Sequence, residues 1–335
     1  MHLPRPRGPI SAALGTALRG SPHALPSSVL DHAQRPGGFA LSDEDLQVSL
    51  WICYELSYRG FSDVDEDWET EPSLLAVRAA LEKRMLASLR DLTSPPPRAT
   101  NAPAALKAMI DADDGPGLAL YLQRHATAGQ FAEFVAHRSI YHLKEADPHS
   151  WAIPRISGRA KAALVEIQSD EYGAGRLERM HSELFRAMMR DLGLDDTYGA
   201  YLDQVPAVTL AVSNTMSLFG LHRAWTPALL GHLAVFEMTS SLPNRRYGNG
   251  LRRLGHGTGT TRFYDEHVEA DAVHEQIAMH DLCGGYLEDH PEDTGKLLFG
   301  AACALAADNA MAEFLLQRWE SGRSALHGVL ETDVA

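Results

Sequence analysis

The stretch YDEHVEADAVHE, residues 264–275, decides the fold class that we expect, because its spacing is that of a helix with one ligand-bearing face. It places two histidines and five carboxylates in twelve residues, with no lysine or arginine among them. On a helix each residue turns by about 100°, so His267, Asp271 and His274 fall within an arc of about 60°. One face therefore presents imidazole, carboxylate and imidazole, which are ligands that suit iron, manganese or zinc.

The rest of the chain also predicts helices. Residues 42–60 begin with Ser42 as an N-cap followed by acids, and Gly60 is a natural end. Apolar residues at helical spacing also cover residues 72–92, 117–126, 127–146, 155–173, 175–193, 206–222, 226–243 and 295–322. No series of alternating β-branched segments points to a sheet. The sequence therefore predicts an all-α bundle whose chemistry lies between helices, on inward-facing side chains.

We expect three parts along the chain. Residues 1–40 are rich in proline, glycine and alanine and predict an irregular leader. Residues 41–130 predict an N-terminal helical region packed on the core. Residues 131–325 predict the metal-binding helical bundle.

Composition limits the partners of this protein. The formal net charge of −14 argues against a nucleic-acid partner, because phosphate binding needs a basic surface. Cys53, Cys283 and Cys303 form no CxxC pair, so we expect neither a thiolate zinc site nor a disulfide framework. No run of 18 apolar residues suggests a membrane span. We therefore expect a cytoplasmic protein without nucleic-acid or membrane partners.

Upstream helices offer further metal ligands. Glu178 and His181 form an ExxH pair, whose spacing of three puts both on one helix face. Glu237 lies in an otherwise apolar helix, where an ionised side chain is costly unless it is paired or bound to a metal. Glu145 and Glu171 lie on helical segments before His181.

Each of these features also has an ordinary structural interpretation. The HxxxD face alone is as consistent with a structural role as with a metal site, and Glu171 or Glu178 alone fits a solvated helix. Glu237 is harder to explain in this way, because its neighbours are apolar. Acids and histidines on three separate helices together favour a metal centre.

In these positions the sequence resembles the heme-oxygenase-like diiron oxidases and oxygenases, also called iron-containing redox enzymes. That family places a Glu and a His on one core helix, a Glu on a second and HxxxDxxH on a third. Glu178 and His181 resemble the first contribution and Glu237 the second, while residues 267–274 match the third. The resemblance covers residues 133–319.

The Glu of the first helix is the open assignment. Glu171 and Glu178 are seven residues apart and would share one face of a regular helix. Gly173 and Gly175 weaken the helix between them, so we assign Glu178. Glu171 and Glu145 stay candidates for extra ligands, because some family members recruit an additional carboxylate.

The resemblance also implies a cofactor and a reaction. It implies two iron ions, as Fe(II) or Fe(III), with O2 as co-substrate and a small organic substrate such as an amino acid or another carboxylate. Outcomes among similar enzymes include N-oxygenation, desaturation and carbon–carbon cleavage. Mixed ligation suits this chemistry, because carboxylates offset the charge of oxidised iron while neutral imidazoles leave positions open. Catalytic residues beyond the metal ligands are unknown, and a homodimer is one open oligomeric state.

The glycine-rich segment 244–264 precedes the third ligand helix and is expected to be a connector. Its Arg245, Arg246, Arg252 or Arg253 could anchor a substrate carboxylate by bidentate pairing. Surface arginines on a loop are the favoured alternative.

Two other functions remain open at this point. A ferritin-like diiron bundle takes a Glu from two helices and an ExxH from two others, which would leave His267 without a role. The alternative from a different class is a helical protein that stores iron, or uses a metal only to stabilise its fold, without oxidising a substrate.

Overall fold

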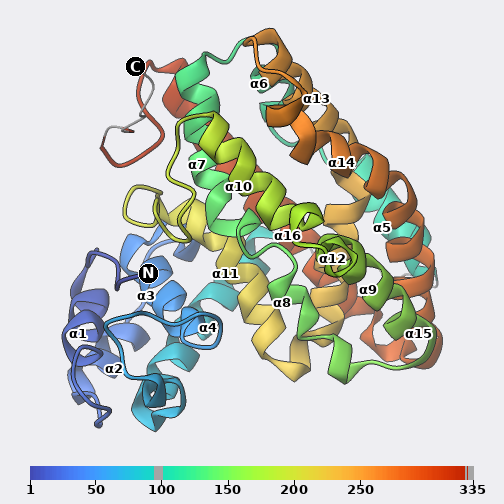
Figure 1. Cartoon of the computed structure of the whole chain (residues 1–335). Coiled ribbons are helices and arrows are strands. Elements are labelled where there is room, and N and C mark those ends of the chain that lie inside the picture. The colour runs from blue at the N-terminus through green and yellow to red at the C-terminus, as the bar shows by residue number, and fades with distance from the viewer. Residues whose placement is uncertain (94–100, 329, 331–335) are drawn as a thin grey trace.

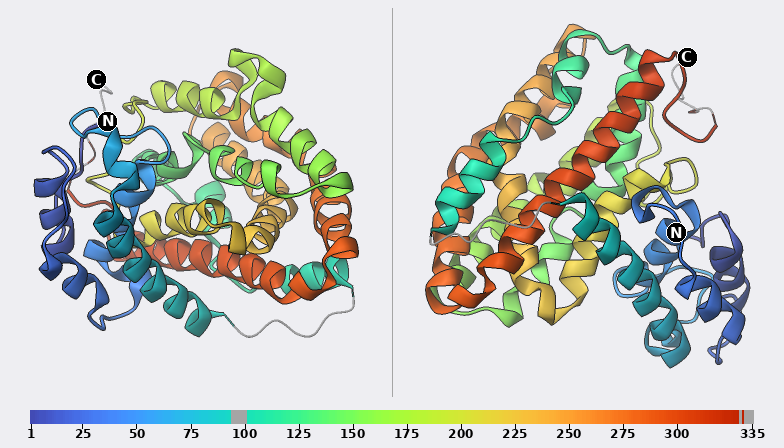
Figure 2. Two further views of the ribbon diagram at one scale, coloured as in Figure 1. Left: turned by 90° about the horizontal axis from the view of Figure 1, so that it is seen from below. Right: turned by 180° about the vertical axis from the view of Figure 1, so that it is seen from behind.

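The computed structural model is built of helices, and the part of the chain that it describes contains no strand (Figure 1). The predicted all-α class is confirmed. Figures 1 and 2 show an N-terminal group of helices beside one flank of a larger bundle. The structure describes residues 1–93, 101–328 and 330, apart from the side chains of Ala102, Asp271 and Ala272.

The helices occupy most of the expected segments and also occur outside them, and the bounds of 72–92 agree at both ends. In chain order they are α1 (Pro9–Ala17), α2 (Ser27–Gln34), α3 (Glu44–Glu55), α4 (Pro72–Leu92), α5 (Ala102–Asp111), α6 (Leu118–Arg124), α7 (Ala128–His142), α8 (Asp147–Ser150), α9 (Gly158–Glu171), α10 (His181–Asp191), α11 (Ala207–Leu221), α12 (Thr226–Thr239), α13 (Ser241–Arg253), α14 (Thr258–Gln276), a π-helical segment (Ile277–Gly284), α15 (Gly285–Asp289) and α16 (Thr294–Glu320).

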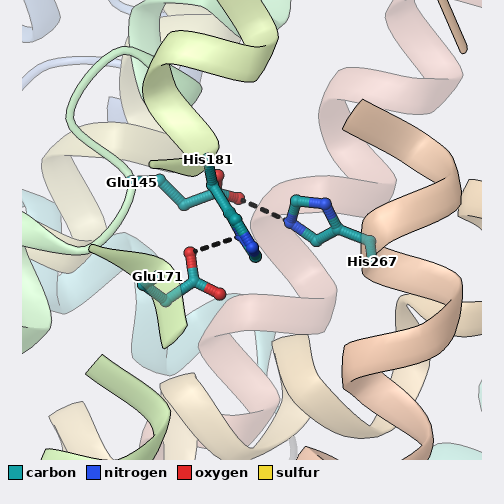
Figure 3. Close-up of side chains that lie close together, drawn as sticks. All are labelled: Glu145, Glu171, His181 and His267. Atoms are coloured by element: carbon teal, nitrogen blue, oxygen red, sulfur yellow. Dashed lines mark ion pairs between the residues drawn. The ribbon is translucent and has the colours of Figure 1, made fainter. Parts of the chain in front are cut away.

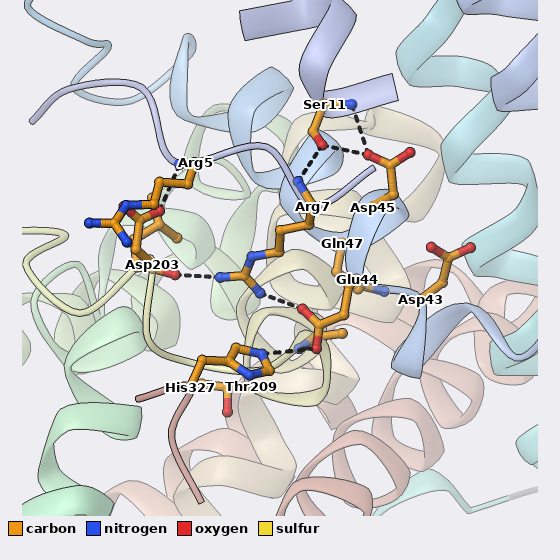
Figure 4. Close-up of polar contacts among 12 residues, drawn as sticks. Arg5, Arg7, Ser11, Asp43, Glu44, Asp45, Gln47, Asp203, Thr209 and His327 are labelled. Carbon is orange, nitrogen blue, oxygen red and sulfur yellow. Dashed lines mark hydrogen bonds and ion pairs between the residues drawn. The ribbon is translucent and has the colours of Figure 1, made fainter. Parts of the chain in front are cut away.

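Residues 1–40 are not the irregular leader that we expected, because they contain α1 and α2 packed on α3 and α4. Acids at the start of α3 hold this region in place (Figure 4). Asp45 accepts hydrogen bonds from two backbone N–H groups at the start of α1. Glu44 pairs with Arg7 and accepts a hydrogen bond from the backbone N–H of Ala207, at the start of α11. The first-turn acids of one helix thus cap two others.

Helices α12 and α16 cross at the centre of the bundle with their backbones in close contact. A Cβ built on Gly231 of α12 would lie 2.0 Å from the carbonyl oxygen of Leu297 in α16. A Cβ on Gly300 of α16 would lie 1.9 Å from the carbonyl oxygen of Ala228 in α12. Both contacts are with backbone atoms, so no side-chain rotation relieves them. Glycine at these positions therefore sets the distance between the two helices.

Two segments differ from the expectation. Residues 241–253 form helix α13 in place of a connector, although they include Gly248 and Gly250. Gly250 serves packing on α6, because a Cβ there would lie 2.7 Å from the carbonyl oxygen of Leu122. The helix expected over residues 175–193 begins only at His181.

One helical stretch of the described chain, Pro291–Glu320, is long and apolar enough to cross a membrane by length and composition. It corresponds to α16, and 56% of its most apolar window is buried inside the bundle. A buried core helix is expected to have this composition, so the stretch is weak evidence for a membrane segment.

We predict that Gly231→Ala destabilises the protein by about 1–3 kcal/mol, because the added methyl group overpacks a backbone contact. Chemical denaturation followed by circular dichroism measures the loss. Gly295→Ala in the first turn of α16 is the matched control, since open space surrounds that position. The control should be neutral or stabilising by roughly 0.5–1 kcal/mol. Equal free energies of unfolding for the two variants would contradict the close crossing of α12 and α16.

Candidate metal centre

Acids and histidines from separate elements meet in the interior of the bundle, and none of their residues is more than 9% exposed. Glu145 lies in the turn between α7 and α8, Glu171 ends α9, His181 begins α10, Glu237 lies in α12, and His267 and His274 lie in α14. Segments far apart in the sequence thus deliver ligand-type atoms to one buried place.

The first group consists of Glu145, Glu171, His181 and His267 (Figure 3). One ligand atom from each residue lies within 4.8 Å of those from the others. His181 Nδ1 is 3.0 Å from Glu171 Oε2, and His267 Nε2 is 3.7 Å from Glu145 Oε1. Two imidazoles and two carboxylates therefore surround one space that could hold a single ion.

The second group consists of Glu171, Glu237 and His274, whose ligand atoms also lie within 4.8 Å of one another. His274 Nδ1 is 3.3 Å from Glu237 Oε2. Its other ring nitrogen, Nε2, is 3.0 Å from Asp170 Oδ2. Glu171 belongs to both groups, so the two candidate ion sites are neighbours joined by one carboxylate.

The pKa of Glu145 shows how strongly its neighbours favour a charged carboxylate. Burial opposes ionisation, but the charge and hydrogen bond of His142, together with His267, outweigh it. They hold the pKa of Glu145 well below its ordinary value. Glu145 is therefore an anion inside an apolar bundle, which is the state that a metal ligand needs.

The neighbouring carboxylates raise the pKa values of two histidines in the centre. Burial lowers the pKa of His181, but the adjacent Glu171 outweighs burial, and the net pKa is raised. Burial also lowers the pKa of His274, while Glu237 and Asp170 raise it to about 9. In the metal-free protein, protons on these rings thus supply part of the positive charge that the buried carboxylates require.

The donor atoms of the two groups fit a bound metal. Among the described residues, Glu145 Oε2, Glu171 Oε2, His181 Nδ1 and His274 Nδ1 are buried and make no hydrogen bond of acceptable geometry, although the last three lie at ion-pair distance from another member of the centre. About 90% or more of buried polar groups in proteins are hydrogen-bonded, so a cluster of such atoms needs a specific cause. Imidazole and carboxylate donors together suit iron, and that ion would satisfy these atoms.

The connection between Glu171 and His181 depends on glycine. Gly173, Ala174 and Gly175 have positive φ angles of 65°, 51° and 75°. A Cβ on Gly173 would lie 2.6 Å from the backbone of the residues just before His181. Glycine at this position lets the chain fold back, so that the end of α9 and the start of α10 face the same space.

This fold-back overturns the predicted ExxH face. Glu178 lies in a short 3₁₀ turn, Leu177–Arg179, and its side chain is exposed. It does not share a helix with His181, because α10 begins at His181 itself. The structure brings Glu171 to the first group in place of Glu178.

Most of the other predicted ligands lie together in the centre. His181, Glu237, His267 and His274 are brought together, and the two extra candidates, Glu145 and Glu171, join them. The Asp271 side chain lies outside the described residues, although its backbone belongs to α14. The assignment of these residues as ligands stays a prediction.

Two polar partners of the centre were not predicted. His142 Nδ1 lies 2.7 Å from Glu145 Oε1, and Asp170 contacts His274 as described above. Partners of this kind orient metal ligands and tune their basicity. His142 could have been found from its spacing of three to Glu145, whereas Asp170 reaches His274 only through the packing of α9 near α14.

A cavity of about 280 Å³ adjoins both groups. The members of the two groups that lie on its wall are Glu145, Glu171, Glu237 and His267. Arg138 and Asp308 also line it, with Arg138 Nη1 at 2.7 Å from Asp308 Oδ1. Open space for a small molecule is thus continuous with the candidate metal centre.

The arginines suggested by the sequence have other contacts. Arg252 pairs with Asp265, and Arg253 donates to backbone carbonyls at the end of α6 and just after it. Neither these two nor Arg245 and Arg246 are among the described residues that line the cavity. Their interpretation as surface arginines is the one that the structure supports.

We predict that metal binding tightens as the pH rises, because an ion must displace the proton from His274. With a pKa of about 9, His274 is protonated at neutral pH. Each pH unit below that value should cost up to about tenfold in apparent affinity for one displaced proton, and the gain should level off above it. Anaerobic Co(II) titrations between about pH 6.5 and about pH 9 measure the slope. A flat profile would contradict the proton-bearing state of His274.

Comparison with known proteins agrees with this geometry. The sequence profile of the iron-containing redox enzyme family matches residues 132–309, which contain every member of both groups. A nitrosourea synthase from Streptomyces achromogenes subsp. streptozoticus is 26% identical over 150 residues, covering 44% of this chain and 31% of that protein. The chain thus aligns with about a third of the length of this relative. Because the profile covers more than half of the chain, the heme-oxygenase-like bundle is confirmed and this protein belongs to the iron-containing redox enzyme family of oxidoreductases.

Proposed function

We propose that this protein is a non-heme diiron oxygenase that uses O2 to oxidise a small organic substrate. The observation that carries the proposal is the sharing of Glu171 by two buried ligand groups beside a cavity. A single open iron site would need neither the second histidine-containing group nor a carboxylate common to both.

The two groups supply a balanced set of donors for two ions. Glu145, His181 and His267 would hold one ion, Glu237 and His274 the other, and Glu171 would contact both. From its position three residues before His274 we expect Asp271 to complete the second site. When bound, iron supplies the electrons that O2 reduction requires, while the carboxylates offset the charge of its oxidised form.

The cavity limits the size and polarity of the substrate. A volume of about 280 Å³ suits a small molecule. The side chain of Arg138 is only 11% exposed and lies beside Asp308 on the cavity wall. A guanidinium and a carboxylate side by side can bind a substrate carboxylate and a substrate amine. We therefore propose an amino acid or a similar small amphoteric molecule, oriented by these two residues.

Among the outcomes open to such enzymes we propose oxygenation at nitrogen. The relative is named a nitrosourea synthase, and a nitrosourea contains a nitrogen–oxygen bond. A neutral amine that donates a hydrogen bond to Asp308 would keep the nitrogen lone pair that the new nitrogen–oxygen bond requires.

The ferritin-like arrangement receives less support from the geometry. It would use Glu178 and leave His267 without a role. In the structure Glu178 is exposed, whereas His267 lies within the first group. The cavity beside the centre likewise supports substrate oxidation over iron storage.

A pair of glutamate variants tests this proposal. Glu171→Ala should lower iron binding by at least about tenfold at both sites and abolish O2-dependent product formation, because the carboxylate common to both groups is lost. Glu178→Ala is the matched control and should bind iron and consume O2 like the unmodified protein, since that side chain is exposed. Iron analysis after anaerobic loading, O2 consumption and mass spectrometry of a panel of amino acids and amines provide the measurements.

The outcomes separate the alternatives. Loss of iron binding in Glu178→Ala with full binding in Glu171→Ala would contradict the assignment of the shared carboxylate. Iron uptake by the unmodified protein without any O2-dependent organic product would contradict the oxygenase and favour iron storage.

A further inference from the structure

Glu145 reaches the metal centre from a short turn that has little helical support of its own. Helix α7 ends at His142 and α8 begins at Asp147, so Glu145 lies between two helices. We call residues 143–146 the Glu145 turn. Turn hydrogen bonds, such as the one from Lys144 N–H to the carbonyl oxygen of Tyr141, shape this segment, but no continuous helix runs through it, so side-chain contacts also contribute to the position of Glu145.

Helix α3 of the N-terminal region contacts the Glu145 turn through a buried ion pair. Lys144 Nζ lies 3.1 Å from Glu55 Oε2, at the end of α3. The two side chains are 1% and 0% exposed. Tyr198 donates a hydrogen bond of 2.9 Å to the same Glu55 oxygen. The Lys144 ammonium also lies 4.0 Å from the ring centroid of Trp51 in α3, at cation–π distance.

Arg59, just after α3, contacts the first residue of the same turn and the residue that follows the turn. Its Nη2 donates a hydrogen bond of 3.0 Å to the carbonyl oxygen of Leu143. The same nitrogen lies 3.7 Å from Asp147 Oδ2. Two residues of the N-terminal region, Glu55 and Arg59, therefore contact the turn before Glu145, and Arg59 also contacts Asp147 just after the turn.

The free energy of a buried ion pair favours a role for Glu55 and Lys144 in fixing the position of the turn over a role in stability. Burying two charges costs free energy that their attraction repays only with good geometry, and apolar residues of similar size often give equal or greater stability. A buried pair of this kind fixes where its partners lie, because either charge becomes costly if the other moves away. Lys144 and Glu145 are neighbours in the chain, so a fixed Lys144 also restricts Glu145.

We propose that Glu55 and Arg59 are positioning residues of the metal centre, which fix the Glu145 turn and thereby set the affinity of the ion bound by the first group. Both lie outside residues 132–309, the part of the chain that matches the family. The N-terminal region is then a component of the metal centre in this protein. This inference rests on the proposed function, since it takes Glu145 as a ligand.

Anaerobic Co(II) titration of the full chain, followed by visible absorption, tests the proposal. Glu145→Ala defines the spectrum and affinity that result when this ligand is lost. Glu55→Gln should shift both toward those of Glu145→Ala, with about 10–100-fold weaker binding at one site and an unchanged second site. Arg59→Ala should shift them in the same direction, and its side chain is 49% exposed, so this variant is expected to fold.

Glu82→Gln is the matched control. Glu82 is also a buried glutamate of the N-terminal region. Its Oε1 lies 3.5 Å from Arg78 Nε and 2.9 Å from His222 Nε2. It should lose stability without any change in Co(II) affinity or spectrum. An equal loss of affinity in Glu82→Gln would overturn the proposal, because it would show a general effect of destabilisation.

Unchanged Co(II) binding in both Glu55→Gln and Arg59→Ala would also overturn it. If the unmodified protein binds only one Co(II), the two-ion function fails on its own. The positioning role is then judged by the same criterion, which is whether Glu55→Gln follows Glu145→Ala.

Discussion

Buried carboxylates need positive charge beside them, and this need is the constraint on which the centre of the molecule depends. Glu145, Glu171 and Glu237 are all less than a tenth exposed in an apolar helical bundle. Leaving such anions without compensation would cost several kcal/mol each. The pKa values of His181 and His274 are raised by neighbouring carboxylates, which favours protonated rings as a source of part of this charge when no metal is bound. Metal ions at the two groups would replace these protons as the source of positive charge and would satisfy buried atoms that make no hydrogen bond.

Three of the six residues of the two groups lie within helices, and the other three lie at helix ends or in a turn. Glu237, His267 and His274 lie within α12 and α14, whose geometry fixes them directly. The other three members are Glu145, Glu171 and His181, which lie at helix ends or in a turn. Their positions therefore depend on the conformation of the connecting segments and on contacts with other elements. The fold-back at Gly173 brings the end of α9 and the start of α10 together. Contacts from α3 and Arg59 hold the Glu145 turn. The first ion site therefore depends on more of the chain than the second.

The same division explains what could be predicted from the sequence. The periodicity of a helix places His267 and His274 on one face, and apolar neighbours mark Glu237 as a buried acid. Glu178 was preferred to Glu171 because the helix was extended through residues 175–180, whereas the backbone leaves helical geometry there. The sequence does not predict the helices of residues 1–40, because proline and glycine there indicate an irregular chain, whereas acids at the start of α3 hold this segment through contacts distant in sequence. Local periodicity therefore indicates the candidate ligands that lie on helices, whereas contacts between distant segments position the other candidates.

Anomalous diffraction at the iron absorption edge, from crystals loaded anaerobically with Fe(II), tests the central claim most directly. We expect two anomalous peaks, one on each side of Glu171, of which one lies next to His181 and His267 and the other next to His274 and Glu237. A single peak, or a peak coordinated by Glu178 with Glu171 turned away, would contradict it.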